Sequence, residues 1–461
     1  MEERVSRAVG AHPRAPLLMK VQTKAAAVTS PITTACRMCR NCHLIPLLSL
    51  GEQRLSGVFP APDAPQPSSS PLELIKCDDA DGRACGLVQL KHSASIQEMY
   101  GATYGYHSSL SPTMVSHLQA KADHLMAFVE PKPGDVVLDI GCNDGTLLNY
   151  FGGRRLVRVG IDPSSKKFAE NFQDDIRVID DFFSADRVRE VIGEETCRII
   201  TSIAMLYDLE DPLAFMRQIR SLLARDGVWA FEQSYLPLML TNLTYDQICH
   251  EHVTYFGLRQ IQWMADRTGL KILDVYFNQV NGGSFYVIAG RDDGSFTPNH
   301  ERIQQVLQAE APLDTLEPFT RFRNRVLSHR DDVRNFLRLA KEAGKTVYGY
   351  GASTKGNIVL NFCGVGPGDL TAICDRNVEK HGLVTPGTKI PIIAPDEMRR
   401  ASPDYLLVLI WHFRREVIED EREYLMRGGT LVFDLPRMHT VDRENAARYL
   451  DAPFEELAFS L

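Results

Sequence analysis

The chain has 461 residues, of which 44% are hydrophobic and 24% are charged, a composition typical of ordinary globular proteins. Domains usually contain about 100–200 residues, so this length predicts two to four domains rather than one core. The net charge of −8 gives no electrostatic support for a nucleic-acid partner. No apolar run approaches the roughly 18 residues of a membrane span, and we expect no membrane association.

Residues 1–34 are rich in basic residues, alanine and proline, without the sustained apolar core and cleavage site of a secretory signal. We interpret them as a disordered N-terminal extension and expect a cytoplasmic, reducing location. In such a compartment the ten cysteines are thiols or metal ligands rather than disulfides. Those in apolar or strand-like contexts are predicted to be core thiols: Cys142, Cys197, Cys249, Cys363 and Cys374.

Residues 35–92 form a turn-rich segment with too little apolar periodicity for a core of its own. The proline-rich stretch 60–71 is predicted to be loop, because proline lacks the N–H that helices and sheets use. Small domains of this kind usually need a metal or disulfides to fold. We therefore expect a metal-stabilised module in this part of the chain.

Cysteines in this module follow the spacing of metal ligands, with a C-x-x-C knuckle at 36–39 and a wider pair downstream. Four thiolates in a tetrahedron can replace a missing core, and they leave no open position for catalysis. The alternatives are that Cys42 or His43 competes as a ligand, or that the cysteines are buried free thiols. We predict a structural Zn²⁺ bound by Cys36, Cys39, Cys77 and Cys85.

From residue 93 to 295, short apolar runs alternate with helical stretches, which predicts a parallel, doubly wound α/β sheet ending in an antiparallel hairpin. A charged helical connector is expected at 296–345, followed by a second, smaller α/β domain at 346–461. In the first α/β domain the predicted strands are 136–141, 156–162, 198–205 and 227–233, and the hairpin strands are 270–277 and 284–290. In the last domain they are 346–351, 370–375, 405–411 and 430–436.

A glycine-containing turn at 139–145 closes the first of these strands and opens a helix, so a ligand can approach its backbone beside a helix N-terminus. Asp162 follows the next strand, where a carboxylate can accept both hydroxyls of a ribose. The acidic and aromatic pair at 181–182 can meet an adenine edge and face. A plain glycine turn is the alternative. We predict a cofactor site formed by Asp139, Gly141, Asn143, Gly145, Asp162, Asp181 and Phe182.

A polar patch at 245–252, with the sequence YDQICHEH, follows the strand that ends near residue 233, and so lies at the ligand-binding edge of the sheet. A neutral, well-positioned histidine can take a proton from carbon beside a ketone. Glu251 can orient it or bind a sugar hydroxyl. Thr254 stands where a zinc-protease helix would need a second histidine, so the segment is not expected to be such a helix. The alternative is a polar surface turn.

Two further clusters carry weaker signals. Tyr104, Tyr106, His107, Ser108 and Ser109 precede the first sheet strand, and such groups can cap a cofactor or donate to an enolate oxygen.

The motif GYGASTKGN at 349–357 joins a strand to a helix, where backbone amides, Ser353 and Lys355 can meet a diphosphate. Thr354 occupies the place of the third fingerprint glycine, so nicotinamide binding is not expected. Asp375 follows the second strand of this domain and either contributes to a site or only caps the turn.

Together these segments resemble the sugar C-methyltransferase family, which joins a zinc-binding domain, a class I methyltransferase core and a C-terminal Rossmann-like domain. The resemblance covers about residues 35–440. It rests on the order and spacing of CRMC, ACGLVQL, YGYHSSLS, LDIGCNDG, YDQICHEH, NGGS and GYGASTKGN.

The resemblance implies methylation of C3 of a nucleotide-linked, commonly dTDP-linked, 4-keto-6-deoxysugar, with S-adenosylmethionine as cosubstrate. Carried onto this sequence, His252 is the base, Glu251 its neighbour on the sugar, and Tyr106 part of an active-site tyrosine motif. Substrate contacts are expected from Tyr245, His107, Asn281, Ser353 and Lys355. We expect a monomer.

The chain departs from the family at three places. One branch has a histidine after the fourth strand, where this chain reads 204–207 as AMLY. Cys249 stands where a tyrosine is familiar, and Tyr286 where an arginine is common. These differences bear on the sugar and the carbon position. The alternative functions are O- or N-methylation of another small metabolite, or a non-catalytic zinc-containing binding protein.

Overall fold

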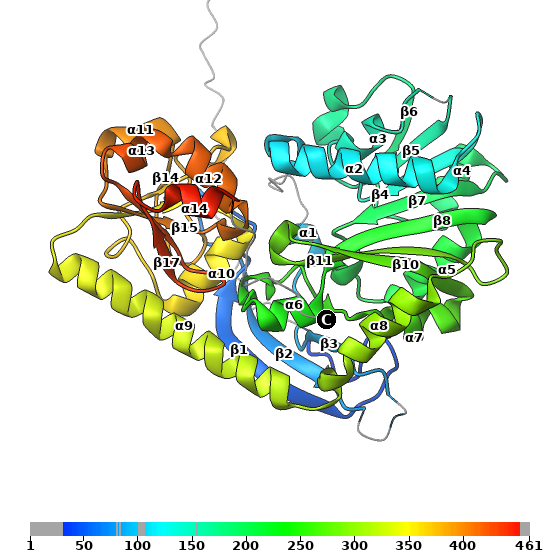
Figure 1. Ribbon diagram of the computed structural model, residues 1–461, viewed down its shortest axis with the longest axis horizontal. Helices are drawn as coiled ribbons and strands as arrows, with labels where there is room; N and C mark the ends of the chain where they lie inside the picture. The colour runs from blue at the N-terminus through cyan, green and yellow to red at the C-terminus, as the bar shows by residue number, and fades with distance from the viewer. Residues whose placement is uncertain (1–30, 80–81, 83, 100–106, 154, 452–461) are drawn as a thin grey trace, which may run out of the picture.

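The structure is a computed structural model that describes residues 31–79, 82, 84–99, 107–153 and 155–451. In these ranges the strands form three sheets, seen in Figure 1 as an N-terminal sheet mostly in blue, a central sheet in cyan and green, and a C-terminal sheet that runs from yellow to red. Among the described helices, none combines the length and apolar character needed to cross a bilayer.

The central sheet has seven strands in the order β10-β11-β8-β7-β4-β5-β6. Its parallel part and its antiparallel β10–β11 hairpin confirm the predicted doubly wound α/β class. All five residues of β4 are buried, as expected for a parallel strand covered on both faces. The strands are β4 (Val136–Ile140), β5 (Val157–Ile161), β6 (Ile176–Ile179), β7 (Cys197–Ile203), β8 (Leu223–Ser234), β10 (Leu270–Asn278) and β11 (Ser284–Arg291).

Helices cover both faces of this sheet, and α2 lies along one of them in Figure 1. Alternate residues of β8 explain the two cores, because Val228 and Ala230 pack with α2 and α3, whereas Trp229 and Phe231 pack with the helices opposite. These helices are α2 (Pro112–Val129), α3 (Thr146–Asn149), α4 (Ala185–Ile192), α5 (Pro212–Leu222) and α7 (Leu258–Thr268), with α1 (Ile96–Met99) and α6 (Leu236–Thr241) nearby in the chain.

The N-terminal sheet has the order β1-β2-β3-β9, where β9 (Thr254–Tyr255) directly follows the polar patch 245–252. Its other strands are β1 (Leu44–Arg54), β2 (Ser69–Cys77) and β3 (Val88–Leu90). The prediction of loop through residue 71 is wrong at 69–71, since Pro71 lies within β2. It lies beyond the part of β2 that pairs with β3, so its missing N–H removes no bond to that strand.

Residues 31–33, assigned to the extension, also differ from the expectation. Ile32 forms a β-bridge with His92, and the Thr33 N–H donates to the Lys91 carbonyl over 2.7 Å. The ordered module therefore begins before the first cysteine.

The C-terminal sheet has the order β14-β13-β12-β15-β16-β17, parallel except for β17. Its strands are β12 (Val347–Tyr350), β13 (Ile373–Cys374), β14 (Ile392–Ile393), β15 (Tyr405–Val408), β16 (Thr430–Phe433) and β17 (His439–Val441). Sequence reasoning missed β14 and β17, which are only two and three residues long. Its helices are α10 (Thr354–Cys363), α11 (Pro395–Ala401), α12 (Arg414–Asp420), α13 (Arg422–Met426) and α14 (Ala446–Asp451).

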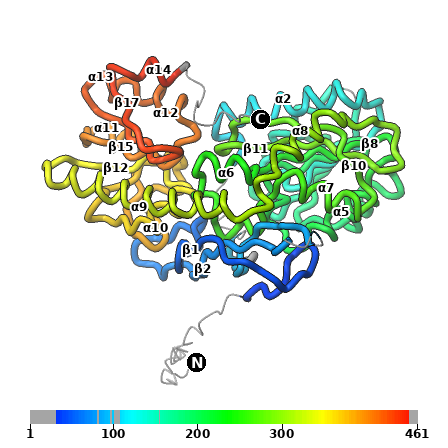
Figure 2. Tube along the Cα trace, turned by 60° about the horizontal axis from the view of Figure 1, so that its bottom comes forward, coloured from blue at the N-terminus to red at the C-terminus, as the bar shows by residue number. Residues whose placement is uncertain are grey.

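The connector contains α8 (His300–Ala309) and the long α9 (Glu317–Glu342), which Figure 2 shows crossing from the central to the C-terminal sheet. One apolar cluster joins residues of the N-terminal sheet, α9, the C-terminal sheet and the patch residues Tyr245, Ile248 and Cys249. The polar patch is therefore anchored in a core shared by the N- and C-terminal parts, and it faces the central sheet from there.

Candidate active site and zinc centre

A cavity of about 450 Å³ lies at the carboxyl edge of the central sheet. All three parts of the chain line it, including Gly57 and Phe59 from the N-terminal module, the turns after β4, β5 and β7, and residues 353–355 from the start of α10. Ligand sites in doubly wound sheets form at this edge, and the volume is in the range of small-molecule pockets.

The predicted cofactor turn forms one wall of this cavity. Gly141 has φ +73°, a left-handed conformation that disfavours other residues, and Asp139, Gly141 and Asn143 all line the cavity. Asp139 is buried and accepts a 2.6 Å hydrogen bond from the Thr201 hydroxyl. Burial raises the pKa of this carboxyl to about 7, although the hydrogen bond opposes the shift.

Asp162 follows β5 and also lines the cavity. Its carboxylate accepts the backbone N–H groups of Asn143 and Ser164 over 3.0 and 2.7 Å, and the Ser164 hydroxyl over 2.5 Å. These bonds fix the carboxylate and still leave acceptor capacity, because a carboxylate has about four acceptor positions. Its position and chemistry fit a ribose diol.

Gly145 does not line the cavity. It has φ +76° and caps α3, and a Cβ built on it would lie 2.6 Å from the Phe172 ring. Glycine is needed there for helix geometry and packing rather than for ligand approach, which corrects the predicted role.

The two residues of the 181–182 pair also differ in whether they line the cavity. Phe182 lines the cavity with half of its surface exposed. Its aromatic face is therefore available to stack on an apolar ring. Asp181 lies outside the cavity lining and forms a 3.0 Å ion pair with Arg187. Phe182 therefore lies where its predicted adenine contact requires, whereas Asp181 does not.

His252 lines the cavity, and its geometry suits a general base. Its Nδ1–H donates to the Gln247 carbonyl over 3.0 Å, since a carbonyl can only accept, and this leaves the Nε2 lone pair available. The Tyr207 ring lies 4.0 Å from the imidazole, centroid to centroid. Burial, reinforced by the charge of Lys355, lowers the pKa of His252 to about 3, which keeps the ring neutral.

Glu251 lines the cavity beside His252, at the junction of the three parts. A Cβ built on Gly57 would lie 2.7 Å from Glu251 Oε1 and 3.4 Å from the Thr354 hydroxyl oxygen. Glycine at position 57 therefore makes room for this carboxyl group. Burial raises the pKa of Glu251.

His250 and Tyr245 of the same patch do not line the cavity. His250 Nε2–H donates to the Ser70 carbonyl over 3.1 Å and so links the patch to β2, and burial lowers its pKa to about 4. Tyr245 is fully buried, and its hydroxyl contacts His329 Nδ1 over 3.0 Å. The predicted substrate contact from Tyr245 is therefore wrong, because its side chain is a packing group of the shared core.

Three of the predicted substrate contacts do meet at the cavity: Asn281, Ser353 and Lys355. The Lys355 ammonium donates to the Asn281 carbonyl over 3.3 Å, and its burial lowers the pKa of this lysine. Ser353 is the N-cap of α10, and its hydroxyl accepts the Gly356 N–H over 2.9 Å. A cation beside the start of a helix suits an anionic group such as a phosphate.

The cluster before the first sheet strand is placed only in part. Tyr104 and Tyr106 lie outside the described residues. Ser108 lines the cavity, and its N–H donates to the Asn143 side-chain oxygen over 3.1 Å. His107 lies off the cavity lining, packed edge-on against Phe168 with ring centroids 4.6 Å apart. This position does not support the predicted substrate contact.

Several cavity residues escaped sequence reasoning. Glu232, at the end of β8, accepts hydrogen bonds from His117 and Asn278 over 2.6 and 2.7 Å, and pairs with Lys121 at 2.7 Å. Gln233 follows it and is 2% exposed. The strand-end position was the available signal, since polar residues that end a parallel strand lie at the ligand edge.

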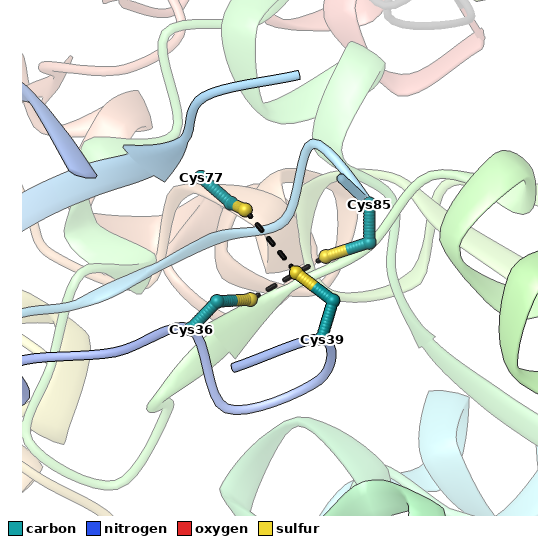
Figure 3. A group of neighbouring side chains, drawn as sticks. All are labelled: Cys36, Cys39, Cys77 and Cys85. Carbon is teal, nitrogen blue, oxygen red and sulfur yellow. Dashed lines mark hydrogen bonds between the residues drawn. The ribbon is translucent and has the colours of Figure 1, made fainter. Parts of the chain in front are cut away.

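The four predicted zinc ligands come together at one point (Figure 3). Their sulfur atoms lie within 4.8 Å of one another, with 3.4 Å between Cys36 and Cys85 and 3.5 Å between Cys39 and Cys77. A tetrahedral zinc site with Zn–S bonds of about 2.3 Å places its sulfurs about 3.8 Å apart, so the set fits this metal.

The competing ligands stay outside the cluster. The C-x-x-C knuckle is closed by the Arg40 N–H, which donates to the Cys36 carbonyl over 3.0 Å, and Arg40 itself has φ +64°. Cys42 is exposed beyond this turn. The five cysteines predicted to be core thiols are all buried, which confirms that prediction.

Three family models match the chain in the order of its three parts. A model described as "Putative zinc binding domain" matches residues 36–100, one described as "Methyltransferase domain" matches 114–275, and "C-methyltransferase C-terminal domain" matches 279–436. C-methyltransferase NovU of Streptomyces niveus is 29% identical over 423 residues, covering 89% of this chain and 97% of that protein.

Solved structures are similar only over part of the chain. Magnesium protoporphyrin IX methyltransferase ChlM from Synechocystis PCC 6803 with bound SAH is 16% identical, with a TM-score of 0.31, covering 41% of this chain and 90% of that one. PH0226 protein from Pyrococcus horikoshii OT3 is 17% identical, with a TM-score of 0.32 and coverage of 40% and 94%. Similarities this slight carry no argument about residues or substrate.

The domain matches and the central sheet with its cofactor turn define an S-adenosylmethionine-dependent class I methyltransferase that also binds a structural zinc ion. Within this class, the chain carries the three matched domains in succession, and it is similar to a C-methyltransferase over 89% of its length.

Proposed function

We propose that the chain methylates C3 of a nucleotide-linked 4-keto-6-deoxysugar, most simply a dTDP-sugar, through an enolate formed by His252. One observation carries the proposal: a neutral imidazole, fixed through Nδ1, shares one cavity with the Gly141–Asp162 cofactor wall. The relative NovU is named a C-methyltransferase, which supports carbon as the acceptor.

The chemistry needs a base because a C–H bond does not attack a methyl group unaided. His252 Nε2 takes the C3 proton, and the C–H electron pair forms the C3–C4 double bond while the carbonyl electrons move to oxygen. S-adenosylmethionine, when bound, supplies an electrophilic methyl group on a sulfonium sulfur. The enolate carbon forms the new C–C bond, and the C–S electron pair stays on sulfur. His252 then releases its proton to solvent.

The low pKa of His252 has a cost and a benefit. A weakly basic imidazole provides less driving force for proton removal, so the enolate must be stabilised by groups around its oxygen. In return, the base is unprotonated at any physiological pH. Glu251, beside it, is assigned to a sugar hydroxyl.

The C-terminal part supplies the contacts for the nucleotide. Lys355 and the start of α10 at Ser353 are assigned to the diphosphate, with Asn281 orienting the lysine. Lys380 also lines the cavity and adds a second cation. An uncharged metabolite would not need a buried cation next to a helix N-terminus. The presence of this cation therefore favours a nucleotide-sugar over a neutral small molecule.

The test is exchange of the C3 proton with solvent deuterium, measured by NMR on a dTDP-4-keto-6-deoxyhexose without S-adenosylmethionine. The wild-type protein should catalyse exchange and, with the methyl donor present, give a product one methyl group heavier. His252→Asn should abolish both reactions while S-adenosylhomocysteine affinity stays within about threefold.

His250→Asn is the matched control, because His250 lies two residues away and does not line the cavity. It should retain exchange. Methyl transfer to oxygen or nitrogen without C3 exchange would refute the carbon-acid mechanism, and near-normal turnover in His252→Asn would refute the assigned base. Failure to bind S-adenosylhomocysteine would favour the non-catalytic alternative.

A further inference from the structure

The side chain of Gln233 is an unsatisfied buried amide in the wall of the cavity. It is 2% exposed and is the penultimate residue of β8. Within the described part of the chain, neither its Nε2 nor its Oε1 has a hydrogen-bond partner. An unpaired buried amide is destabilising, so such groups call for an explanation.

The position of Gln233 puts this amide near the reacting groups. It continues the row of Trp229 and Phe231, whose rings stack 4.2 Å apart, whereas Glu232 points to the opposite face. The Glu232 carbonyl accepts the Ala204 N–H over 2.7 Å, so Gln233 lies beside the turn 204–207. That turn carries Tyr207, the ring against His252, at one end of the cavity wall.

The other end of the same turn reaches the cofactor wall. Met205 lies 3.5 Å from the position of a Cβ built on Gly141. Gln233 therefore adjoins a turn that spans from the methyl-donor side to the base. A substrate carbon between the two would bring its neighbouring carbonyl oxygen to this wall.

A packing role does not account for the amide. Gln260 is a comparable buried glutamine, 5% exposed, away from the cavity. Its Nε2 donates to the Cys85 carbonyl and its Oε1 accepts the Gly257 N–H, both over 3.0 Å. The fold thus satisfies Gln260 fully. Three other buried glutamines each have one unpaired amide atom and one that is hydrogen-bonded: Gln53, Gln89 and Gln247. Gln233 differs from all of them because neither of its amide atoms has a partner in the described part of the chain.

We propose that the Gln233 amide donates a hydrogen bond to the C4 oxygen of the substrate, where negative charge develops when His252 removes the C3 proton. The inference rests on the proposed function. A neutral amide donor stabilises an enolate without protonating it, and its gain is largest in a site shielded from water. No atom is transferred to or from Gln233, so it assists the step without changing its balance.

Two substitutions of similar size test the proposal. Gln233→Met removes both polar atoms, and Gln233→Glu keeps the shape but replaces the donor with a carboxylate. Each should slow C3 deuterium exchange in dTDP-4-keto-6-deoxyhexose by about 100-fold, the usual effect of losing an oxyanion donor. Affinity for S-adenosylhomocysteine, measured by calorimetry, should stay within about twofold.

Ser202→Ala is the matched control, since Ser202 is buried in the neighbouring β7, accepts the Trp229 Nε1–H and does not line the cavity. It should exchange at the wild-type rate. Exchange by Gln233→Met at that same rate would overturn the proposal, as would a loss confined to S-adenosylhomocysteine affinity. Absence of exchange in the wild-type protein would instead refute the carbon-acid function. If Gln233→Met does not fold, Gln233→Glu decides.

Discussion

The central and C-terminal sheets have the same parallel topology at their middle strands, yet they present different chemistry at the carboxyl edge. Each carries a glycine turn after one strand and an aspartate after its neighbour, Gly141 with Asp162 in the first and Gly351 with Asp375 in the second. Gly141 and Asp162 line the cavity, whereas Gly351 and Asp375 do not.

Packing of the glycine turns explains the difference, because both aspartates accept the N–H two residues further on, Asp162 from Ser164 over 2.7 Å and Asp375 from Asn377 over 2.8 Å. Asp375 also pairs with Lys380 at 3.6 Å. A Cβ built on Gly141 would lie no closer than 3.5 Å to the Met205 side chain. A Cβ on Gly351 would lie 2.7 Å from the Ile410 side chain, so that turn is closed by packing. A strand–turn–helix pattern thus fixes where a ligand can bind, and the contacts of the turn decide whether one does.

The sharpest way to test this contrast is a pair of alanine variants. Asp162→Ala should weaken S-adenosylhomocysteine binding about 30-fold, because a hydrogen bond to a charged group contributes about 1.5–3 kcal/mol. Asp375→Ala should leave that affinity within about twofold. Calorimetry measures both, and equal losses would contradict the division between the sheets.

The zinc-binding module is a third region to compare. It contacts the side of the cavity that holds His252 more than the side formed by the cofactor turn. β3 pairs with β9, and the Leu90 N–H donates to the Val253 carbonyl, next to His252. Cys77→Ala should remove zinc and lower turnover about tenfold or more, because structural zinc contributes folding free energy directly.

S-adenosylhomocysteine affinity should change less than turnover in that variant. Zinc stoichiometry by atomic absorption and calorimetry on the same sample make the check, with Cys42→Ala as the control because Cys42 is exposed outside the cluster. Full zinc content in Cys77→Ala would refute the ligand set.

A smaller effect, on the KM for the nucleotide-sugar, is expected where the C-terminal part lines the cavity. Lys355→Met should raise the KM for the nucleotide-sugar about tenfold, through loss of a charge-assisted phosphate contact. Affinity for S-adenosylhomocysteine should be unchanged, in contrast to Asp162→Ala. An exposed lysine of the same part, Lys389→Met, controls for net charge. A loss of methyl-donor affinity instead would place Lys355 on the wrong side of the cavity.

Sequence alone located most of this arrangement, for chemical reasons. The zinc ligands were predictable because four cysteines in a coreless segment have few other uses, and the cofactor turn because its glycine and acidic residues sit at strand ends. The helical character of the connector was predictable from a long charged stretch, although not its division into two helices. His252 was separable from His250 only through the family resemblance, since both histidines occupy the same short patch.

What sequence missed depends on contacts between distant segments. Their own sequence does not indicate that residues 254–255 pair with residues 88–89, and Gln233 is one of three polar residues that end a strand. Tyr245 was misassigned because an aromatic residue beside a catalytic patch can as easily pack into the core. Gly145 has the spacing of a ligand-binding glycine but is required by the Phe172 ring.

The smallest predicted effect is on the pH dependence of catalysis. It involves His252 and, from the C-terminal part, Lys355. Burial first, and then Lys355, depress the pKa of His252 to about 3, so the base stays unprotonated and kcat/KM should show no acid limb near the ordinary histidine pKa of about 6.5. Removing the cation makes protonation easier, so in Lys355→Met any acid limb must move upward. Because burial is the larger cause, the displaced limb should still lie below that ordinary value. A pH profile of C3 exchange between pH 5 and 8 measures it, and a wild-type limb near pH 6.5 would show that the proton acceptor is a more exposed group than His252.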